Sequence, residues 1–97
     1  MNYDGLYEVI FKSADNAEIK LCDESHPIFK AHFPTKPVFP GFIHFEIVSK
    51  LFSLDITTIK KAKFINLVSP NEILVYERKL NTFKVFSGEK EVANFSL

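Results

Sequence analysis

The most constraining feature of this chain is the stretch 26–46, which reads HPIFKAHFPTKPVFPGFIHFE. It contains four of the five prolines and all three histidines. Because the proline ring fixes φ, we expect the stretch to begin as a rigid loop. Pro40 then stands where proline is favoured, at the first position of a helix. The loop and the helix should together deliver His32, Gly41 and Glu46 at fixed offsets.

The remaining sequence predicts an α+β fold. Runs rich in β-branched and aromatic residues predict strands at 7–13, 17–22, 60–68, 72–80, 83–87 and 92–97. A helix is predicted over 42–54, and its apolar residues cover well over half of the circumference, so other structure should wrap it. A short helical turn is expected around 26–29. Since the separators between strands are short, we expect antiparallel hairpins. The predicted architecture is one domain over 1–97, a curved antiparallel sheet around a central helix.

Charge and cysteine content exclude several classes of function. Twelve basic side chains balance twelve acidic ones, so the chain lacks the electrostatic signature of binding to nucleic acid or to an anionic membrane. No apolar run approaches the roughly 20 residues of a membrane span, and no signal peptide is read. Cys22 is the only cysteine, which excludes an internal disulfide and favours a cytoplasmic protein. The eleven phenylalanines need dry surroundings in a core, an interface or a tunnel.

His32 is the candidate general base. It lies between Ala31 and Phe33, and the prolines that follow fix the backbone around it. A histidine in a partly dry site has a lowered pKa and stays neutral, as a base must. The alternative is a hydrogen-bonded histidine in a loop, without a catalytic role.

Gly41 and Glu46 complete the candidate site. N–H groups at a helix start have no intrahelical partner, so those at Gly41 can stabilise a carbonyl oxyanion, unless the residue is a plain helix-start glycine. Glu46 is the one acidic residue of an apolar helix, and removal from water would keep it protonated. Alternatively it is solvated and paired with Lys50. Gly41 and Glu46 point about 140° apart around the helix, which hints at a site completed across a dimer interface.

The other polar residues of interest receive structural interpretations. His44 projects into the apolar arc of the helix, where a backbone carbonyl should satisfy it, although a role in orienting the active-site loop stays open. His26 should cap or brace the loop. Cys22, in a predicted strand, is interpreted as a small buried residue rather than a nucleophile. The histidines lack metal-ligand spacing with Cys22, so no metal site is predicted.

The segment AHFPTKPVFPGFIHFE resembles the signature of the β-hydroxyacyl-acyl-carrier-protein dehydratases of the hotdog-fold superfamily. That pattern runs Gly-His-Phe-Pro-x-x-Pro-Val-x-Pro-Gly, with a carboxylate at the fifth position after the glycine. The positions in register are His32, Phe33, Pro34, Pro37, Val38, Pro40, Gly41 and Glu46. In its brevity the chain is also similar to the short thioester dehydratases of aryl-polyene and related polyketide-type clusters.

The resemblance implies a dehydratase that converts 3-hydroxyacyl thioesters to trans-2-enoyl thioesters in fatty-acid or polyene/polyketide-type biosynthesis. His32 would remove the C2 proton, the Gly41 N–H would polarise the thioester carbonyl, and Glu46 of the other subunit would help the hydroxyl to leave as water. Homodimers are implied, with the site at their interface.

The resemblance also implies how the substrate is carried. It would arrive on the phosphopantetheine arm of an acyl carrier protein, or on coenzyme A, with its acyl chain in a tunnel to which Phe33, Val38 and Phe42 contribute. No metal or redox cofactor is implied, because the thioester itself supplies the acidity.

Some residues depart from the family pattern, and two alternatives follow. Ala31 replaces the usual glycine before the histidine, and Lys50 could keep Glu46 ionised. We also expect the chain to lack the N-terminal extension that contributes to the tunnel of the housekeeping enzymes. One alternative is a non-catalytic hotdog protein that binds acyl chains or pairs with an active homologue. The other is an acyl thioesterase of the same fold, although such enzymes usually lack the His-Phe-Pro loop.

Overall fold

The computed structural model of the protein describes residues 3–32 and 37–97, with residues 31 and 32 described as backbone only. Within that part of the chain the elements are β1 (Tyr7–Lys12), β2 (Asn16–Leu21), α1 (Pro27–His32), α2 (Ile43–Leu51), β3 (Lys61–Phe64), β4 (Ile73–Lys79), β5 (Thr82–Ser87) and β6 (Lys90–Ser96). The predicted α+β class is confirmed.

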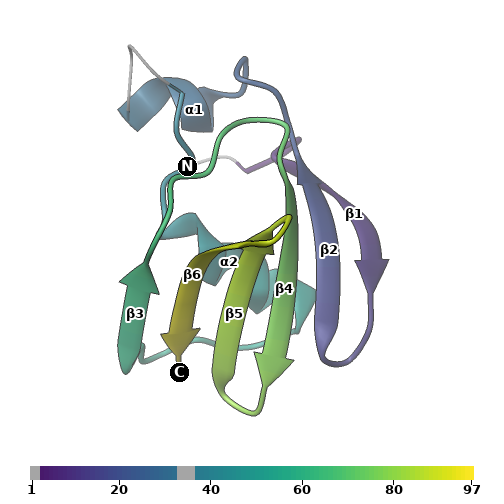
Figure 1. The fold of residues 1–97 in the computed structure, drawn as a ribbon, viewed down its shortest axis with the longest axis vertical. Helices are drawn as coiled ribbons and strands as arrows, with labels where there is room; N and C mark the ends of the chain where they lie inside the picture. The colour runs from purple at the N-terminus through teal and green to yellow at the C-terminus, as the bar shows by residue number, and fades with distance from the viewer. Residues whose placement is uncertain (1–2, 33–36) are drawn as a thin grey trace.

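The strands form one sheet in the order β1-β2-β4-β5-β6-β3, and the neighbouring strands are antiparallel. Alternate residues of the central strands point to one face, so Ile19, Tyr76 and Phe83 are all buried there. This face curves around α2, which lies behind the sheet in Figure 1. The helix and the sheet share one hydrophobic core, as the predicted wrapping of the helix requires.

The predicted hairpin between 60–68 and 72–80 is wrong. β3 is only four residues long and pairs with β6 at the edge of the sheet, whereas β4 pairs with β2 and β5. The chain between β3 and β4 crosses the end of the sheet instead of turning back. There the Phe39 N–H donates to the Val68 carbonyl at 2.7 Å, a bond to the segment before α2. Residue 68 is therefore bonded to the segment before α2 instead of to the predicted partner strand at 72–80.

Helix α2 is shorter than predicted at both ends. It begins at Ile43, and Pro40 lies in the preceding turn, where its carbonyl accepts from the Ile43 N–H at 3.1 Å. The helix ends at Leu51 because Ser53 adopts a positive φ of 53° and the Leu54 N–H turns back to the Ser49 carbonyl at 2.9 Å.

Neither of the helices in the described part of the chain is long and apolar enough to cross a membrane.

Candidate functional site

Helix α1 is capped by His26, which confirms the predicted brace. The Ile28 N–H donates to His26 Nδ1 at 3.1 Å, and Nε2 lies 2.9 Å from the Asp4 carbonyl oxygen. Since Nδ1 accepts, Nε2 carries the hydrogen and donates to Asp4. His26 therefore ties the start of α1 to the N-terminal segment, and Pro27 takes the first helical position, which needs no N–H donor.

The candidate base, His32, is the last residue of α1. Two side chains anchor this helix, because Ile28 and Phe29 are both buried in the core. The Phe29 ring lies 6.3 Å, centroid to centroid, from the ring of Phe39 in the segment before α2. The backbone of α1 is thus held next to the turn that precedes α2. The side chain of His32 and all of Phe33, both predicted site residues, lie outside the part that the structure describes.

Gly41 packs directly under an aromatic ring from β3. A Cβ at position 41 would lie 2.8 Å from the nearest ring carbon of Phe64, closer than real side chains approach. Only glycine therefore fits beneath this ring. Its N–H has no partner recorded among residues 3–32 and 37–97, as expected in the turn before a helix. The residue predicted to polarise a carbonyl thus keeps a backbone donor available.

A mostly apolar cavity of about 330 Å³ adjoins Gly41. It is lined by Phe39, Gly41, Phe42, His44, Phe64, Asn66, Leu67, Val68 and Val92. Of the predicted substrate-binding residues, Phe42 lines the cavity and is 46% exposed, whereas Val38 is buried in the interior and is not among the lining residues described. The cavity therefore brings together two of the predicted residues, Gly41 and Phe42.

His44 is buried, but its partner differs from the predicted one. Nδ1 lies 2.7 Å from the hydroxyl oxygen of Tyr76 on β4, and no backbone carbonyl is recorded as its partner in the described structure. The ring also packs against Phe39, with 5.0 Å between the centroids. Burial lowers the pKa of His44 to about 4, so the imidazole is neutral at physiological pH.

Glu46 faces a different recess from Gly41. It is exposed and lines a shallow recess with Tyr3, Tyr7 and Lys50. No ion pair between Glu46 and Lys50 is recorded in the described structure, so the alternative pairing is not seen. The predicted removal of Glu46 from water is not seen within one chain either, because the side chain is exposed. Gly41 and Glu46 therefore do not meet within one chain. Because α2 begins at Ile43, Gly41 lies in the turn before the helix, and the predicted separation of 140° around the helix does not apply to it.

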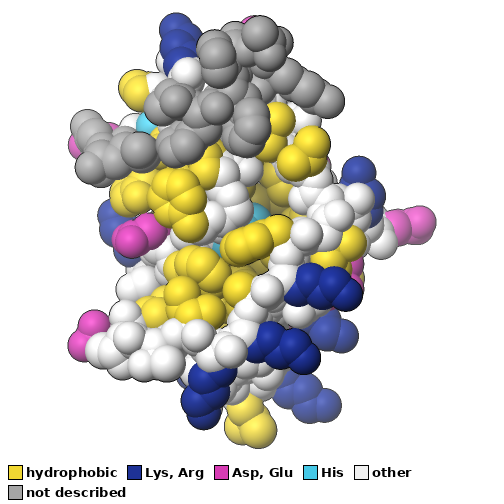
Figure 2. Space-filling view, turned by 90° about the vertical axis from the view of Figure 1, so that its left-hand side faces the viewer, with side chains coloured by type: hydrophobic (Ala, Val, Ile, Leu, Met, Phe, Trp, Pro, Cys, Tyr) yellow, Lys and Arg dark blue, Asp and Glu magenta, His cyan; other side chains and the backbone are white. Residues whose placement is uncertain are grey.

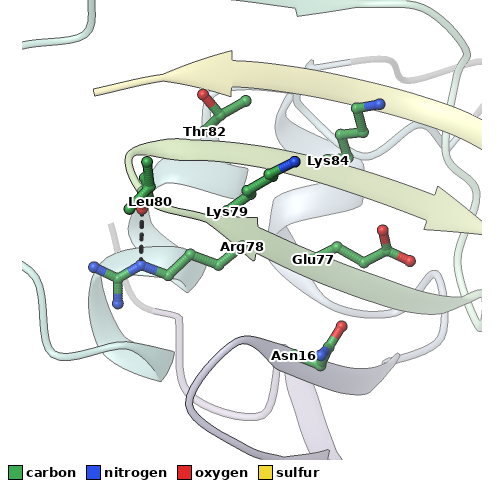
Figure 3. Close-up of a pocket in the computed structure, with 7 residues that line it drawn as sticks. All are labelled: Asn16, Glu77, Arg78, Lys79, Leu80, Thr82 and Lys84. Atoms are coloured by element: carbon green, nitrogen blue, oxygen red, sulfur yellow. Dashed lines mark hydrogen bonds between the residues drawn. The ribbon is translucent and has the colours of Figure 1, made fainter.

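A larger recess, about 560 Å³, lies elsewhere and contains none of the predicted site residues. Figure 3 shows that its side chains come from the β4–β5 hairpin and from Asn16 beside it. Arg78 Nε donates to the Leu80 carbonyl at 3.1 Å, so this side chain is engaged in bracing the hairpin. Four charged side chains line this recess, Glu77, Arg78, Lys79 and Lys84, whereas the cavity beside Gly41 is mostly apolar.

Two other predictions concern Cys22 and metals. Cys22 is half-buried rather than buried, and burial raises the pKa of its thiol, which disfavours the reactive thiolate. Within the described residues no group of three or more histidine, cysteine or acidic side chains could hold a metal ion. That the protein needs no cofactor stays a prediction.

Sequence reasoning missed Tyr76 and Phe64. A signal for Tyr76 was available, because alternation along 72–80 places it on the same face as Leu74. A buried tyrosine hydroxyl needs a partner, and His44 in the apolar arc of the helix needs one as well. Phe64 carried no such signal, since its contact with Gly41 depends on β3 pairing with β6.

Comparisons with known proteins point in one direction. The model of the ApeI-like family, described as ApeI dehydratase, matches residues 10–96. The 3-hydroxyacyl-[acyl-carrier-protein] dehydratase FabZ of Aeromonas hydrophila subsp. hydrophila is 33% identical over 70 residues, which cover 72% of this chain and 42% of that protein. The protein of the same name from Caldicellulosiruptor saccharolyticus is 26% identical, over 79% of this chain and 64% of its own length. This chain thus spans less than two thirds of either relative.

A solved structure extends the likeness to the whole fold. The structure described as the dehydratase heterocomplex ApeI:P from Xenorhabdus doucetiae resembles this chain with a TM-score of 0.69 at 19% identity. The match covers 92% of this chain and 93% of that one. The predicted hotdog fold, with its antiparallel sheet wrapped around a helix, is confirmed.

Proposed function

This chain belongs to the ApeI-like dehydratase family, and we propose that it removes water from 3-hydroxyacyl thioesters to give trans-2-enoyl thioesters. The resemblance to hotdog dehydratases that the sequence motif carries is confirmed by the family match over residues 10–96. The observation that most supports the activity is the Gly41 N–H, available at the turn before α2 and beside an apolar cavity.

In the proposed reaction, His32 takes the C2 proton of the substrate. The electron pair of that C–H bond moves toward the thioester carbonyl, whose oxygen the Gly41 N–H stabilises. As the double bond forms between C2 and C3, the 3-hydroxyl leaves with a proton from Glu46, and water is released. The thioester supplies the acidity at C2, so the proposal needs no metal or redox cofactor.

We propose that the site is shared between two subunits of a homodimer. Glu46 lines a different recess from Gly41, so one chain alone does not assemble the site. The side of the molecule that carries β3 exposes large apolar side chains, including Phe64 at 51% and Leu67 at 64%. Figure 2 shows hydrophobic side chains gathered on this side, with basic side chains below them. An unpaired edge strand beside an apolar surface favours association.

The substrate proposed for this site is an acyl group on the phosphopantetheine arm of an acyl carrier protein. The Aeromonas and Caldicellulosiruptor relatives carry that specificity in their names, and the cavity beside Gly41 is mostly apolar, as an acyl chain requires. The cytoplasmic location that Cys22 favours stays a prediction.

A subunit-mixing experiment tests the proposal. The His32→Ala and Glu46→Gln proteins should each fold but fail to hydrate a crotonyl thioester. In an equal mixture about a quarter of the wild-type sites should return, because half of the dimers are mixed and each mixed dimer holds one intact site. A wild-type protein without hydratase activity on several chain lengths and carriers would contradict the proposal. Release of free thiol would indicate a thioesterase, and binding without turnover a non-catalytic protein.

A further inference from the structure

The cavity beside Gly41 contains a polar group that the proposed mechanism does not use. His44 lines the cavity from α2 although the residue is only 2% exposed. The other polar side chain there is Asn66, and its amide nitrogen is engaged with the Glu91 carbonyl at 2.8 Å. The few polar groups of an apolar pocket orient its ligand. His44 is therefore one of the two polar side chains that can orient a ligand in the cavity.

Tyr76 determines which nitrogen of His44 carries the hydrogen. Burial raises the pKa of Tyr76 well above its ordinary value, so the phenol keeps its hydrogen. This O–H needs an acceptor, and among the described residues the one recorded is His44 Nδ1, at 2.7 Å. The phenol therefore donates to Nδ1, and the hydrogen of the neutral imidazole lies on Nε2.

Nε2 is the ring nitrogen of His44 for which no hydrogen bond is recorded in the described part of the chain. In the described part of the chain, no side-chain nitrogen or oxygen shielded from solvent lacks a hydrogen-bond partner. The hydrogen bond recorded for the side chain of His44 is the one at Nδ1, so Nε2 is not fully shielded from solvent, and the cavity that the residue lines is the open space described beside it. Figure 2 shows histidine atoms in a hollow between hydrophobic side chains on this side of the molecule.

His44 and Gly41 border the cavity from the same turn of the chain. His44 follows Gly41 by three residues, and its backbone N–H donates to the Gly41 carbonyl at 3.1 Å. A helical side chain leans toward the N-terminus and covers the turn before its own Cα, which here contains Gly41. Gly41 and His44 thus border one space, and two donors on one oxygen would make an oxyanion hole.

We propose that His44 Nε2–H is a second donor to the thioester carbonyl oxygen, beside the Gly41 N–H. This inference rests on the proposed function, since it places an acyl thioester in this cavity. When the C2 proton leaves, negative charge develops on the carbonyl oxygen and both N–H groups stabilise it. His44 transfers no proton, and a neutral imidazole suits this role because its N–H polarises a carbonyl without giving the proton up.

Two variants separate a hydrogen-bond donor from a packing residue. His44→Gln keeps an N–H near the position of Nε2. The double variant His44→Phe/Tyr76→Phe removes both polar partners but keeps both rings, so no buried hydroxyl is left without an acceptor. Circular dichroism and light scattering establish that each variant has the wild-type fold and assembly.

Hydration of the crotonyl thioester of N-acetylcysteamine gives the kinetic result. In the double variant kcat should fall about 100-fold with a smaller change in KM, because the lost interaction forms mainly in the transition state. His44→Gln should retain most of the activity. A folded double variant with wild-type kcat, or one in which only KM rises, overturns the inference and leaves His44 as a packing residue.

An infrared measurement works without turnover. In the His32→Ala protein, the carbonyl stretching frequency of the bound, isotope-labelled thioester should be lowered by the two donors. Adding His44→Phe/Tyr76→Phe should reduce this shift, whereas adding His44→Gln should largely preserve it. If the shift depends on His44 but the wild-type protein has no dehydratase activity, the inference about the carbonyl donor is supported and the proposed function is not. An unchanged shift, or no thioester binding, overturns it.

Discussion

At the scale of single residues, the contact between Gly41 and Phe64 explains why position 41 needs glycine. The aromatic ring occupies the space that a Cβ would fill. The same contact joins a predicted site residue to the edge strand β3. The glycine therefore serves two purposes, access for a ligand to its N–H and close packing of β3.

Replacement of Gly41 by alanine should destabilise the protein by about 1–3 kcal/mol, the usual effect of overpacking. The Phe64→Ala background provides the matched control, because without the ring the added methyl group has space. Urea denaturation of the four proteins in this double-mutant cycle measures the coupling between the two positions. Equal effects of Gly41→Ala in both backgrounds would show that the ring is not the cause.

His44 should make stability depend on pH in a defined window. Its pKa is lowered from 6.5 to about 4 in the folded protein, so between these values the unfolded chain binds a proton that the folded chain does not. The free energy of unfolding should therefore fall as the pH drops through this window, by about 3 kcal/mol from this residue. Below the window both states are protonated and the contribution levels off.

Urea denaturation of the wild-type and His44→Gln proteins across the same pH range measures this effect. The difference between the two proteins isolates His44 from the carboxyl groups, which titrate in both. The variant should lose less stability on acidification. Parallel curves would contradict the buried, neutral imidazole.

The sequence predicted some residues of the site well and others not at all. The motif identified Gly41, and the helix period placed His44 on the buried face. The partner of His44 could not be predicted, because it comes from β4, 32 residues further along the chain. Which strand residue faces a given helix residue depends on register across the whole sheet, and the local pattern carries no such information.

At the scale of elements, α1 depends on His26 as its cap. The residue satisfies one N–H of the first turn and also holds the Asp4 carbonyl. His26→Ala should destabilise α1 by about 1 kcal/mol, since the cap is lost. Amide hydrogen exchange at Ile28 should become roughly fivefold faster.

His26→Asn is the control for this prediction. Asparagine is a good helix cap, so it should keep the bond to the Ile28 N–H while losing the one to Asp4. Exchange at Ile28 should then stay near the wild-type rate. If the alanine and asparagine variants exchange equally fast, the bond to Asp4 rather than the cap stabilises α1.

The elements themselves were predictable where the pattern was long and periodic. The strands that became β1, β2, β4, β5 and β6 were all predicted within a few residues. β3 was predicted as part of 60–68, but only Lys61–Phe64 is strand. The residues after it are apolar enough to resemble a strand, yet they line the cavity and cross the end of the sheet. Apolar residues that line a cavity and apolar residues in a paired strand give the same sequence pattern, so the pattern alone cannot distinguish them.

At the scale of the whole molecule, the side that carries β3 is the proposed dimer face. Leu67→Glu places a charge in its apolar surface and should convert the dimer to a monomer. Because Leu67 also lines the cavity beside Gly41, assembly rather than activity is the decisive measurement. Size-exclusion chromatography with light scattering measures the assembly.

Leu80→Glu is the matched control. Leu80 is 84% exposed in the β4–β5 turn, outside the proposed dimer face, and the same substitution there should leave both assembly and activity intact. If the Leu67→Glu protein remains a fully active dimer, the subunits associate through another surface, and the apolar edge formed by β1 is then the next candidate.

The position of Phe64 joins two properties that are usually considered separately. The ring belongs to the edge strand, and it also covers the glycine beside the cavity. If the position of the Phe64 ring affects how tightly a ligand binds in the cavity, then ligand binding must also change the affinity of strand β3 for the second subunit. By thermodynamic reciprocity, association of the subunits must change the affinity for the ligand by the same factor. A measurement of subunit association at several ligand concentrations would therefore reveal ligand binding, and the reverse also holds.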